Sequence, residues 1–146
     1  MILCKPDAVS RSLVGEIISR IERRGYVITA MKLMQLDGDR ARQHYAEHRE
    51  KPFFNDLVNF ITSGPLVAMA VEGESVIDGM RQIIGATNPL TAAPGSIRAD
   101  FGQTIGRNMV HGSDSKDAAE RELKIFFEPN EMVSRKHDLE RWIHEI

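Results

Sequence analysis

The stretch LVAMAVEGESVIDGMRQIIG, residues 66–85, decides the class of fold, because it predicts a strand followed by a helix. Residues 66–71 form a short apolar run after the turn signal Ser63-Gly64-Pro65, which is typical of a strand. Residues 75–84 predict an amphipathic helix that ends at Gly85. The apolar face of that helix consists of Val76, Ile77, Met80, Ile83 and Ile84. Strands and helices are therefore expected to alternate along the chain.

The same pairing of helix and strand occurs on the N-terminal side of this stretch. Residues 12–25 predict an amphipathic helix with Ser12 as its N-cap and Gly25 as its stop. Its apolar face consists of Val14, Ile17, Ile18 and Ile21. Residues 27–36 are rich in apolar and β-branched side chains and predict a second strand.

Further segments extend the pattern to both ends of the chain. Residues 1–4 predict a short strand that ends at the turn signal Lys5-Pro6-Asp7. Residues 105–110 predict a final strand, and residues 115–127 and 131–146 predict helices. Short helices are also expected after residues 37–39 and around residues 57–61.

The resulting order is β-α-β-(short helices)-β-α-loop-β-α. Only about four strands are available, which favours a small α/β sandwich over a doubly wound parallel sheet. No internal repeat, low-complexity tract or linker divides the 146 residues. That length predicts a single domain over residues 1–146.

Composition excludes several classes of protein. The net charge of -2 argues against a protein that coats nucleic acid, yet it allows a small anionic ligand held by a few cations. The single cysteine, Cys4, excludes an intrachain disulfide framework and a cysteine-rich zinc site. No apolar run reaches the roughly 20 residues of a membrane span, and the few residues before Lys5 are too short for a secretory signal. We therefore expect a cytoplasmic protein with no membrane partner.

Residues 85–104 fit no periodic template, and a loop of this length in a compact domain is usually functional or disordered. Arginines occur before, within and after the loop, at Arg81, Arg98 and Arg107, whereas Asp100 is the one acid between residues 79 and 111. Arginine forks and the backbone N–H groups of glycine suit phosphate oxygens. The segment is therefore a candidate phosphate site, and a long connection with packing roles alone is the alternative.

His111 closes an apolar run and is followed at once by small polar residues that begin a helix. On spacing alone, this is a histidine at a strand end with ordinary capping by Ser113 or Ser115. The helix N-terminus favours an anion, however, and Glu122 on that helix could fold back toward His111. A neutral imidazole nitrogen is a competent nucleophile toward phosphorus, so a phosphoryl-transfer site is the second interpretation.

The segment Gly106-Arg107-Asn108-Met109-Val110-His111-Gly112-Ser113-Asp114-Ser115 resembles the active-site signature of nucleoside diphosphate kinases. The resemblance covers essentially the whole chain in order and spacing. The other matching motifs are Lys5-Pro6-Asp7, His44-Tyr45, Lys51-Pro52-Phe53-Phe54, Ser63-Gly64-Pro65, Thr87-Asn88-Pro89 and Pro94-Gly95-Ser96-Ile97-Arg98-Ala99-Asp100-Phe101. It implies a ferredoxin-like α/β sandwich with a four-stranded antiparallel sheet.

The resemblance also implies roles in a ping-pong transfer of the γ-phosphoryl group from a nucleoside triphosphate, typically ATP, to a diphosphate, maintaining NTP and dNTP pools. His111 would be phosphorylated on the ring nitrogen nearer the backbone, and Ser113 and Glu122 would orient it. Tyr45 would pack and hydrogen-bond beside it. Phe53 would stack on the nucleobase. The remaining contacts would come from Arg81, Thr87 and Arg98 on the phosphates and from Lys5 and Asn108 on the sugar hydroxyls and the reactive phosphate.

Cofactor and partners follow from the same resemblance. Mg²⁺ would be carried by the β- and γ-phosphates, with no direct protein ligand and with Asp114 contributing at most through water. The partners would be nucleoside tri- and diphosphates, with no obligate nucleic acid. The chain would assemble with itself, as a hexamer because it continues through Trp142 like the longer family members, or as a tetramer.

Other interpretations remain open from the sequence. A nucleotide- or nucleic-acid-binding module on the same fold, without turnover, is the main alternative, because fold alone does not define function. A protein-histidine phosphotransfer carrier is a weaker one, since it needs no nucleobase platform. His44 and His48 have the i, i+4 spacing of metal ligands, but with no third ligand apparent they predict an ordinary surface helix.

Overall fold

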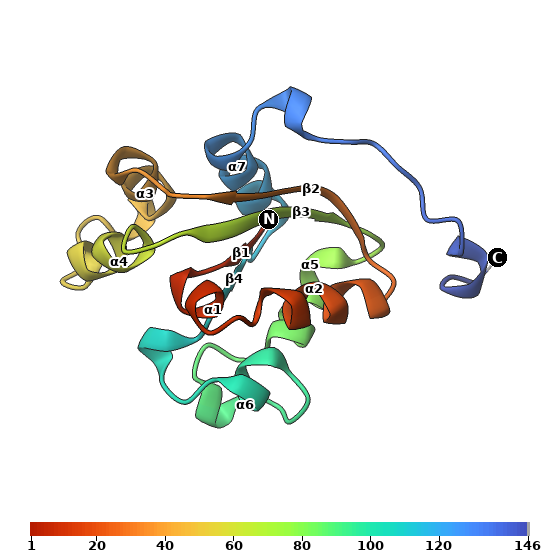
Figure 1. The fold of residues 1–146 in the computed structure, drawn as a ribbon, viewed down its shortest axis with the longest axis horizontal. Coiled ribbons are helices and arrows are strands. Elements are labelled where there is room, and N and C mark those ends of the chain that lie inside the picture. Colours follow the sequence, from red (N-terminus) through yellow and green to blue (C-terminus); the bar gives the residue numbers. More distant parts are fainter. Residues whose placement is uncertain (146) are drawn as a thin grey trace.

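The computed structural model describes residues 1–145 and is built on one antiparallel sheet (Figure 1). The four strands of this part of the chain lie in the order β2-β3-β1-β4. Their bounds are β1 Ile2–Cys4, β2 Val27–Met34, β3 Leu66–Glu72 and β4 Val110–Gly112. The expected ferredoxin-like α/β fold with a four-stranded antiparallel sheet is therefore confirmed.

Seven α-helices accompany the sheet within the described residues. They are α1 Pro6–Ser10, α2 Val14–Arg23, α3 Gly38–His44, α4 Phe54–Ile61, α5 Val76–Ile84, α6 Ile97–Phe101 and α7 Lys116–Phe126. Short 3₁₀ turns lie at Ala46–His48, Pro89–Thr91, Ile105–Arg107, Pro129–Glu131 and Glu140–Trp142.

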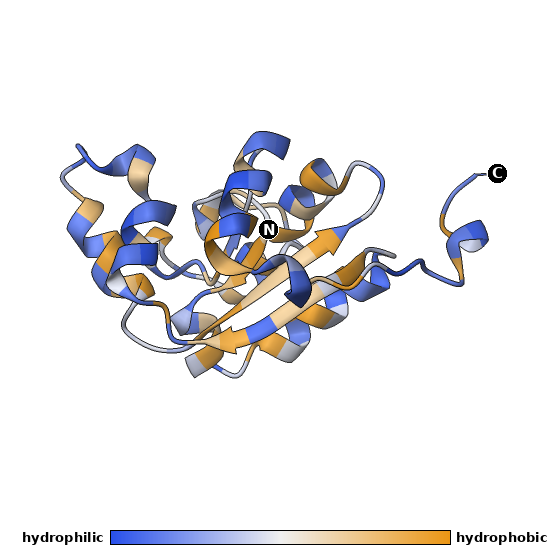
Figure 2. Ribbon diagram, turned by 90° about the horizontal axis from the view of Figure 1, so that it is seen from above, coloured by the Kyte–Doolittle hydropathy of each residue, from blue (hydrophilic) through white to orange (hydrophobic). Residues whose placement is uncertain are grey.

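Both faces of the central strands are buried, which explains the unbroken apolar run in β3. Successive side chains of a strand point to opposite faces. Leu3 faces the core formed with α3, α4 and α7, whereas Ile2 and Cys4 face the core formed with α1, α2, α5 and α6. Figure 1 shows α2 and α5 on the side of the sheet opposite α7, and Figure 2 shows strands that are mostly hydrophobic and helices that carry both hydrophobic and hydrophilic residues.

Three predicted boundaries were wrong for identifiable physical reasons. Ser12 has a φ of +58° and precedes the actual N-cap, Leu13, so its hydroxyl does not cap α2. Residues 105–110 are not one strand, because Met109 has a φ of +68°, which a strand cannot contain. Residues 85–104 are not a featureless loop but include α6 and a 3₁₀ turn.

The predicted helix over residues 131–146 was also wrong as far as the chain is described; residue 146 lies outside the described residues. Beyond the turn at Pro129–Glu131, the Val133 N–H donates to the Thr29 carbonyl at 2.8 Å, so the chain runs beside β2 (Figure 1). Helices in proteins depend on packing their apolar face. Val133, Leu139 and Trp142 are instead all more than half exposed, so no such face is packed.

Within residues 1–145, no helix is long and apolar enough to cross a lipid bilayer. The strand β4 lies beside β1 at one edge of the sheet and leads directly toward α7. This junction brings together most of the candidate residues.

Candidate active site

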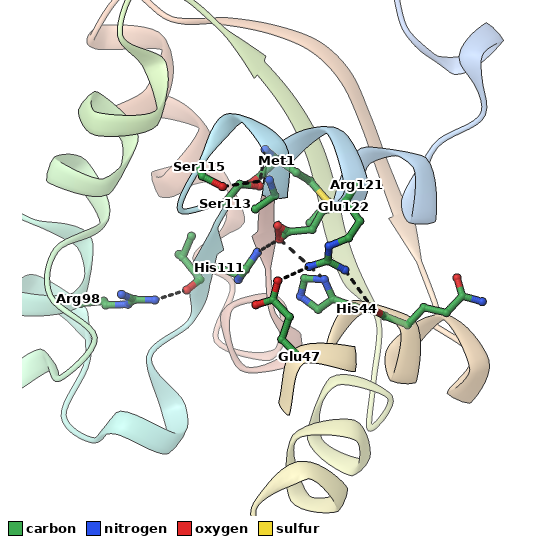
Figure 3. A network of polar contacts seen from close by, with 12 residues as sticks. Met1, His44, Glu47, Arg98, His111, Ser113, Ser115, Arg121 and Glu122 are labelled. Carbon is green, nitrogen blue, oxygen red and sulfur yellow. Dashed lines mark hydrogen bonds and ion pairs between the residues drawn. The ribbon is translucent and has the colours of Figure 1, made fainter. Parts of the chain in front are cut away.

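His111 lies on β4 directly opposite Leu3 of β1, so its side chain points to the face of the sheet covered by α7. The helix α7 begins where the Ser115 hydroxyl accepts the Ala118 N–H at 3.0 Å. Two turns further on, the buried carboxylate of Glu122 faces His111 and accepts a hydrogen bond from its Nε2 (Figure 3). This contact fixes the tautomer: with the proton on Nε2, the lone pair of the neutral ring lies on Nδ1.

Glu122 remains ionised despite its position. Burial opposes ionisation, but the hydrogen bond and electrostatic interaction with His111, with smaller contributions from His44 and Ser113, lower the pKa of Glu122 below its usual value. Ser113 is itself buried, and its Oγ accepts the Met1 amine at 3.0 Å. The site therefore holds a carboxylate directly behind the imidazole.

A strained turn places the start of β4. Met109 adopts a positive φ that is unfavourable for a bulky side chain. Its N–H donates to the Asp7 carboxylate at 3.0 Å, and its carbonyl accepts the Lys5 N–H at 2.8 Å. The motif Lys5-Pro6-Asp7 thus holds the backbone two residues before His111.

Lys5 and Asn108 form a polar pair at the floor of the same region. The Lys5 ammonium donates to the Asn108 Oδ1, and the Asn108 Nδ2 donates to the Thr87 carbonyl at 3.0 Å. Burial, followed by the positive charges of Arg98 and Arg107, lowers the pKa of Lys5 to about 8, although Asp7 opposes the shift. The positive charge of Lys5 is therefore destabilised by burial and by neighbouring cations. An anion that binds beside Lys5 would stabilise that charge.

Arg98, on α6, connects the long loop to β4. Its guanidinium donates to three backbone carbonyls, those of Asn108 at 3.3 Å, Gly85 at 3.1 Å and Val110 at 2.6 Å. Burial and the neighbouring Arg81 lower its pKa to about 10, so it stays charged at neutral pH. In this structure Arg98 positions the backbone beside His111, while Arg81 and Thr87 are exposed at the pocket wall.

Aromatic rings extend from His111 toward solvent. The His44 ring packs edge-on against His111 with a centroid distance of 4.7 Å, and Tyr45 contacts His44 at the same distance. Burial raises the pKa of Tyr45 to about 12. Further out, Phe53 is 46% exposed and lies 5.7 Å from the His48 ring. Tyr45 therefore reaches the site through His44, and Phe53 presents a ring at the entrance.

One pocket of about 1060 Å³ is lined by nearly all the predicted site residues. They are Lys5, Tyr45, Phe53, Arg81, Thr87, Arg98, Asn108, His111, Asp114 and Glu122. Ser113 is not part of the lining and lies behind it, against Met1. Residues that are up to 117 positions apart in the sequence thus share one cavity, which combines several cations, an aromatic platform and a histidine with a free lone pair.

Two further residues at this site were not among the candidates. His44 was predicted to lie on a surface helix, which was wrong: it is 5% exposed and packs between His111 and Phe126. Its position three residues after Ala41, which is also buried, could have indicated that both side chains lie on the same buried face of α3.

Arg121 on α7 lies 3.7 Å from the Glu47 carboxylate and donates to the Gln43 carbonyl at 3.3 Å (Figure 3). A charged residue on a helix surface carries no sequence signal for such a contact.

Comparison with known proteins gives consistent matches. A family model described as nucleoside diphosphate kinase matches residues 1–132. Among curated proteins, a nucleoside diphosphate kinase of Archaeoglobus fulgidus is 55% identical over 144 residues, 99% of this chain and 95% of that protein. One from Desulforamulus reducens is 52% identical, covering 99% and 97% of the two chains.

Solved structures also match over nearly the whole chain. A halophilic nucleoside diphosphate kinase from Halobacterium salinarum, solved in complex with CDP, is 46% identical with a TM-score of 0.95, covering 99% of this chain and 96% of that one. A nucleoside diphosphate kinase family protein from Babesia bovis is 41% identical with a TM-score of 0.95, covering 98% and 97%.

Proposed function

Since the chain belongs to the nucleoside diphosphate kinase family and transfers a phosphoryl group between nucleoside tri- and diphosphates, we propose that His111 carries that group as a phosphohistidine. The observation that carries the proposal is the contact of His111 Nε2 with the buried carboxylate of Glu122, which leaves the lone pair on Nδ1. No observation favours a binding module without turnover.

The proposed transfer has two halves at one site. The His111 Nδ1 attacks the γ-phosphorus of the triphosphate, the bond to the bridging oxygen breaks, and the diphosphate leaves. A second diphosphate then attacks the phosphohistidine and takes the group from it, which makes the kinetics ping-pong. The Glu122 carboxylate compensates the positive charge that develops on the imidazole as Nδ1 bonds to phosphorus.

The pocket supports specific contacts with the nucleotide. Lys5, Arg81 and Arg98 supply positive charge for the phosphates, and Thr87 supplies a hydroxyl beside them. Asn108, which accepts a hydrogen bond from Lys5, would contact the sugar and the reactive phosphate. The exposed ring of Phe53 offers a surface for base stacking, which accepts any nucleobase. Preorganised charge and positioning account for most of the catalysis in such transfers.

Mg²⁺ fits this donor set as a cation carried by the substrate. Mg²⁺ keeps several waters and is usually held by phosphates and one or two carboxylates. Asp114, an exposed carboxylate on the pocket wall, would hold it through water. When bound, the ion neutralises the charge of the β- and γ-phosphates.

The exposed apolar surfaces support a homo-oligomer. Met31 and Leu33, on the edge strand β2, are 53% and 67% exposed, and Leu90, in the long loop, is 80% exposed. The apolar pair on β2 suits an isologous contact with a second copy, and Leu90 offers a further apolar contact, so we propose a hexamer, with a tetramer as the alternative. Light scattering that returned the mass of one 16.4 kDa chain would contradict this assembly.

The nucleotide substrates support a cytoplasmic location.

A labelling experiment tests the phosphohistidine directly. The full chain is incubated with Mg²⁺ and γ-labelled triphosphate without any acceptor. We expect one labelled phosphoryl group per chain, labile in acid and stable in base, which a diphosphate then removes. A stable complex with nucleotide but no labelled protein would support the binding-module alternative instead.

The ionisation of Lys5 predicts a pH dependence of nucleotide binding. Because its pKa is about 8 in the free protein, Lys5 loses its charge as the pH rises through that value. We expect the affinity for ADP to fall by about tenfold between pH 7 and 9.5, as one charged hydrogen bond is lost. Adenosine, which has no phosphates, serves as the control, and calorimetry at each pH is the measurement. An equal loss of affinity for both ligands would refute the role of Lys5.

Removing the Phe53 ring should weaken the binding of nucleotides to a similar extent whatever their base. Base stacking on an aromatic side chain contributes about 1–3 kcal/mol. We therefore expect Phe53→Ala to raise KM by about tenfold or more for ADP and for GDP alike, with a smaller change in kcat. Phe53→Tyr is the matched control, because it keeps the ring. Unchanged KM values in steady-state assays of the alanine variant would exclude stacking at this position.

A further inference from the structure

A cluster of three potential metal ligands lies behind the nucleophile. His44, His111 and Glu122 each present one ligand atom, and these atoms all lie within 4.8 Å of one another. The His44 Nδ1 is 3.9 Å from Glu122 Oε1, and the His111 Nε2 contacts the same oxygen (Figure 3). Two imidazoles and a carboxylate are the donor set of many catalytic zinc sites.

His44 is not explained by the transfer reaction described above. Its side chain is 2% exposed, and neither of its ring nitrogens has a hydrogen-bond partner within residues 1–145. A buried polar group without a partner costs about 1–3 kcal/mol, which an apolar side chain would avoid at this position.

We propose that His44, His111 and Glu122 bind a divalent transition-metal cation of the Zn²⁺ type, and that the bound cation blocks phosphorylation of His111. The second half of the proposal rests on the proposed function of His111. The site is distinct from that of Mg²⁺, which prefers oxygen ligands and is carried by the nucleotide.

The geometry needs only side-chain movement to hold such an ion. Zinc bonds of about 2.0 Å in a tetrahedral arrangement keep two ligand atoms about 3.3 Å apart. His44 must approach Glu122 by less than 1 Å from its present 3.9 Å, and the contact between His111 and Glu122 must open. All three ligand residues line the pocket, so water can supply the fourth ligand. Because the second nitrogen of His44 has no partner among the described residues, we expect weaker binding than in a structural zinc site.

Occupation of the cluster would change the tautomer of His111. A neutral imidazole has one N–H and one lone pair. In the metal-free protein the Nε2 proton points to Glu122, and the lone pair lies on Nδ1. A cation on Nε2 uses the lone pair there, so the proton moves to Nδ1, which can no longer attack phosphorus. None of the three proposed ligands is among the residues proposed to contact the base, the sugar or the phosphates of the nucleotide.

Metal binding is measured first, without nucleotide, on the full chain. Equilibrium dialysis with Zn²⁺ and visible absorption with Co²⁺ give affinity and coordination number. We expect one ion per chain, bound more weakly than in a structural zinc site, with a four-coordinate Co²⁺ spectrum. We expect His44→Leu, which keeps a similar volume, to weaken binding by at least about tenfold. Thermal unfolding establishes that this variant folds.

A matched control separates this cluster from other histidines. His144 Nδ1 lies 3.1 Å from a Glu74 carboxylate at the protein surface, so His144→Asn removes a competing pair. This variant should bind Zn²⁺ with the same affinity as the wild-type protein. In wild-type protein labelled with ¹⁵N-histidine, stoichiometric Zn²⁺ should shift the ring nitrogens of His44 and His111. Shifts confined to other histidines, or binding of wild-type affinity that survives His44→Leu, would overturn the proposal.

The inhibitory effect has its own readout. Zn²⁺-loaded wild-type protein should form labelled phosphoprotein at least about tenfold more slowly than metal-free protein, while its affinity for a non-hydrolysable triphosphate stays the same. A chelator should restore the rate, and His44→Leu should be insensitive to the same Zn²⁺ concentration. If the proposed role of His111 failed, labelling would be absent even without metal, whereas the binding measurement would stand on its own.

Discussion

Replacing His111 by alanine is expected to abolish phosphoryl transfer, with a loss of kcat of about 10³-fold or more. The reason is that the variant loses the Nδ1 that is proposed to attack phosphorus, together with the Nε2 contact to the Glu122 carboxylate. A coupled exchange assay from GTP to ADP measures the rate, and γ-labelled triphosphate measures the phosphoprotein. Both signals should disappear together.

Two controls make this result specific. Calorimetry should show that His111→Ala still binds ADP, because Phe53 and the cations of the pocket remain in place. His144→Ala, a histidine variant outside the pocket, should transfer phosphate at the wild-type rate. Normal transfer or normal labelling by His111→Ala would show that another residue carries the phosphoryl group.

Replacing Arg98 by alanine is expected to cause the second-largest loss, because it affects both stability and activity. Three backbone carbonyls lose a charged donor. Hydrogen bonds to charged groups contribute about 1.5–3 kcal/mol each, and the losses at one residue overlap, so we expect destabilisation by about 3–5 kcal/mol. For a chain of this length that corresponds to a fall in Tm of roughly 10 °C.

Activity should fall for a geometric reason as well. The Val110 carbonyl that Arg98 holds belongs to the residue directly before His111. A displacement of about 1 Å at a reacting group can cost about 10²-fold in rate, so we expect kcat/KM to fall by that order. Arg98→Lys should recover little, because one ammonium cannot reproduce the guanidinium fork.

Arg107→Ala is the matched control for Arg98. Its guanidinium stacks on the Phe60 ring at 4.2 Å and is largely exposed, an arrangement that contributes about 0.5–1 kcal/mol. Thermal unfolding at one fixed protein concentration compares the variants, because assembly makes Tm depend on concentration. Equal Tm values for the two alanine variants would show that the Arg98 contacts contribute little.

Local sequence patterns determined the class of fold because those patterns report burial. The helical faces of residues 12–25 and 75–84 and the apolar run at residues 66–71 correspond to α2, α5 and β3. The patterns failed where long-range contacts decide the backbone. Asp7 and Lys5 hold Met109 in a conformation that breaks a strand, and neither contact is visible in the local sequence.

The family motifs named the candidate residues, and the structure gathers most of them around one cavity. Motifs could not show what each residue contacts. Arg98, expected to hold phosphate, also donates to three backbone carbonyls. His44 was expected on a surface and instead packs against His111.

The sequence by itself determined the helices and strands with clear periodicity, the family, and the identity of the candidate nucleophile, because each depends on residue type and spacing. Only the tertiary structure decided the chemistry of that nucleophile. Leu3 of β1 sets the direction of His111, and α7 carries Glu122 to its Nε2. The tautomer of His111, and the cluster it forms with His44, depend on distances between segments that local patterns do not encode.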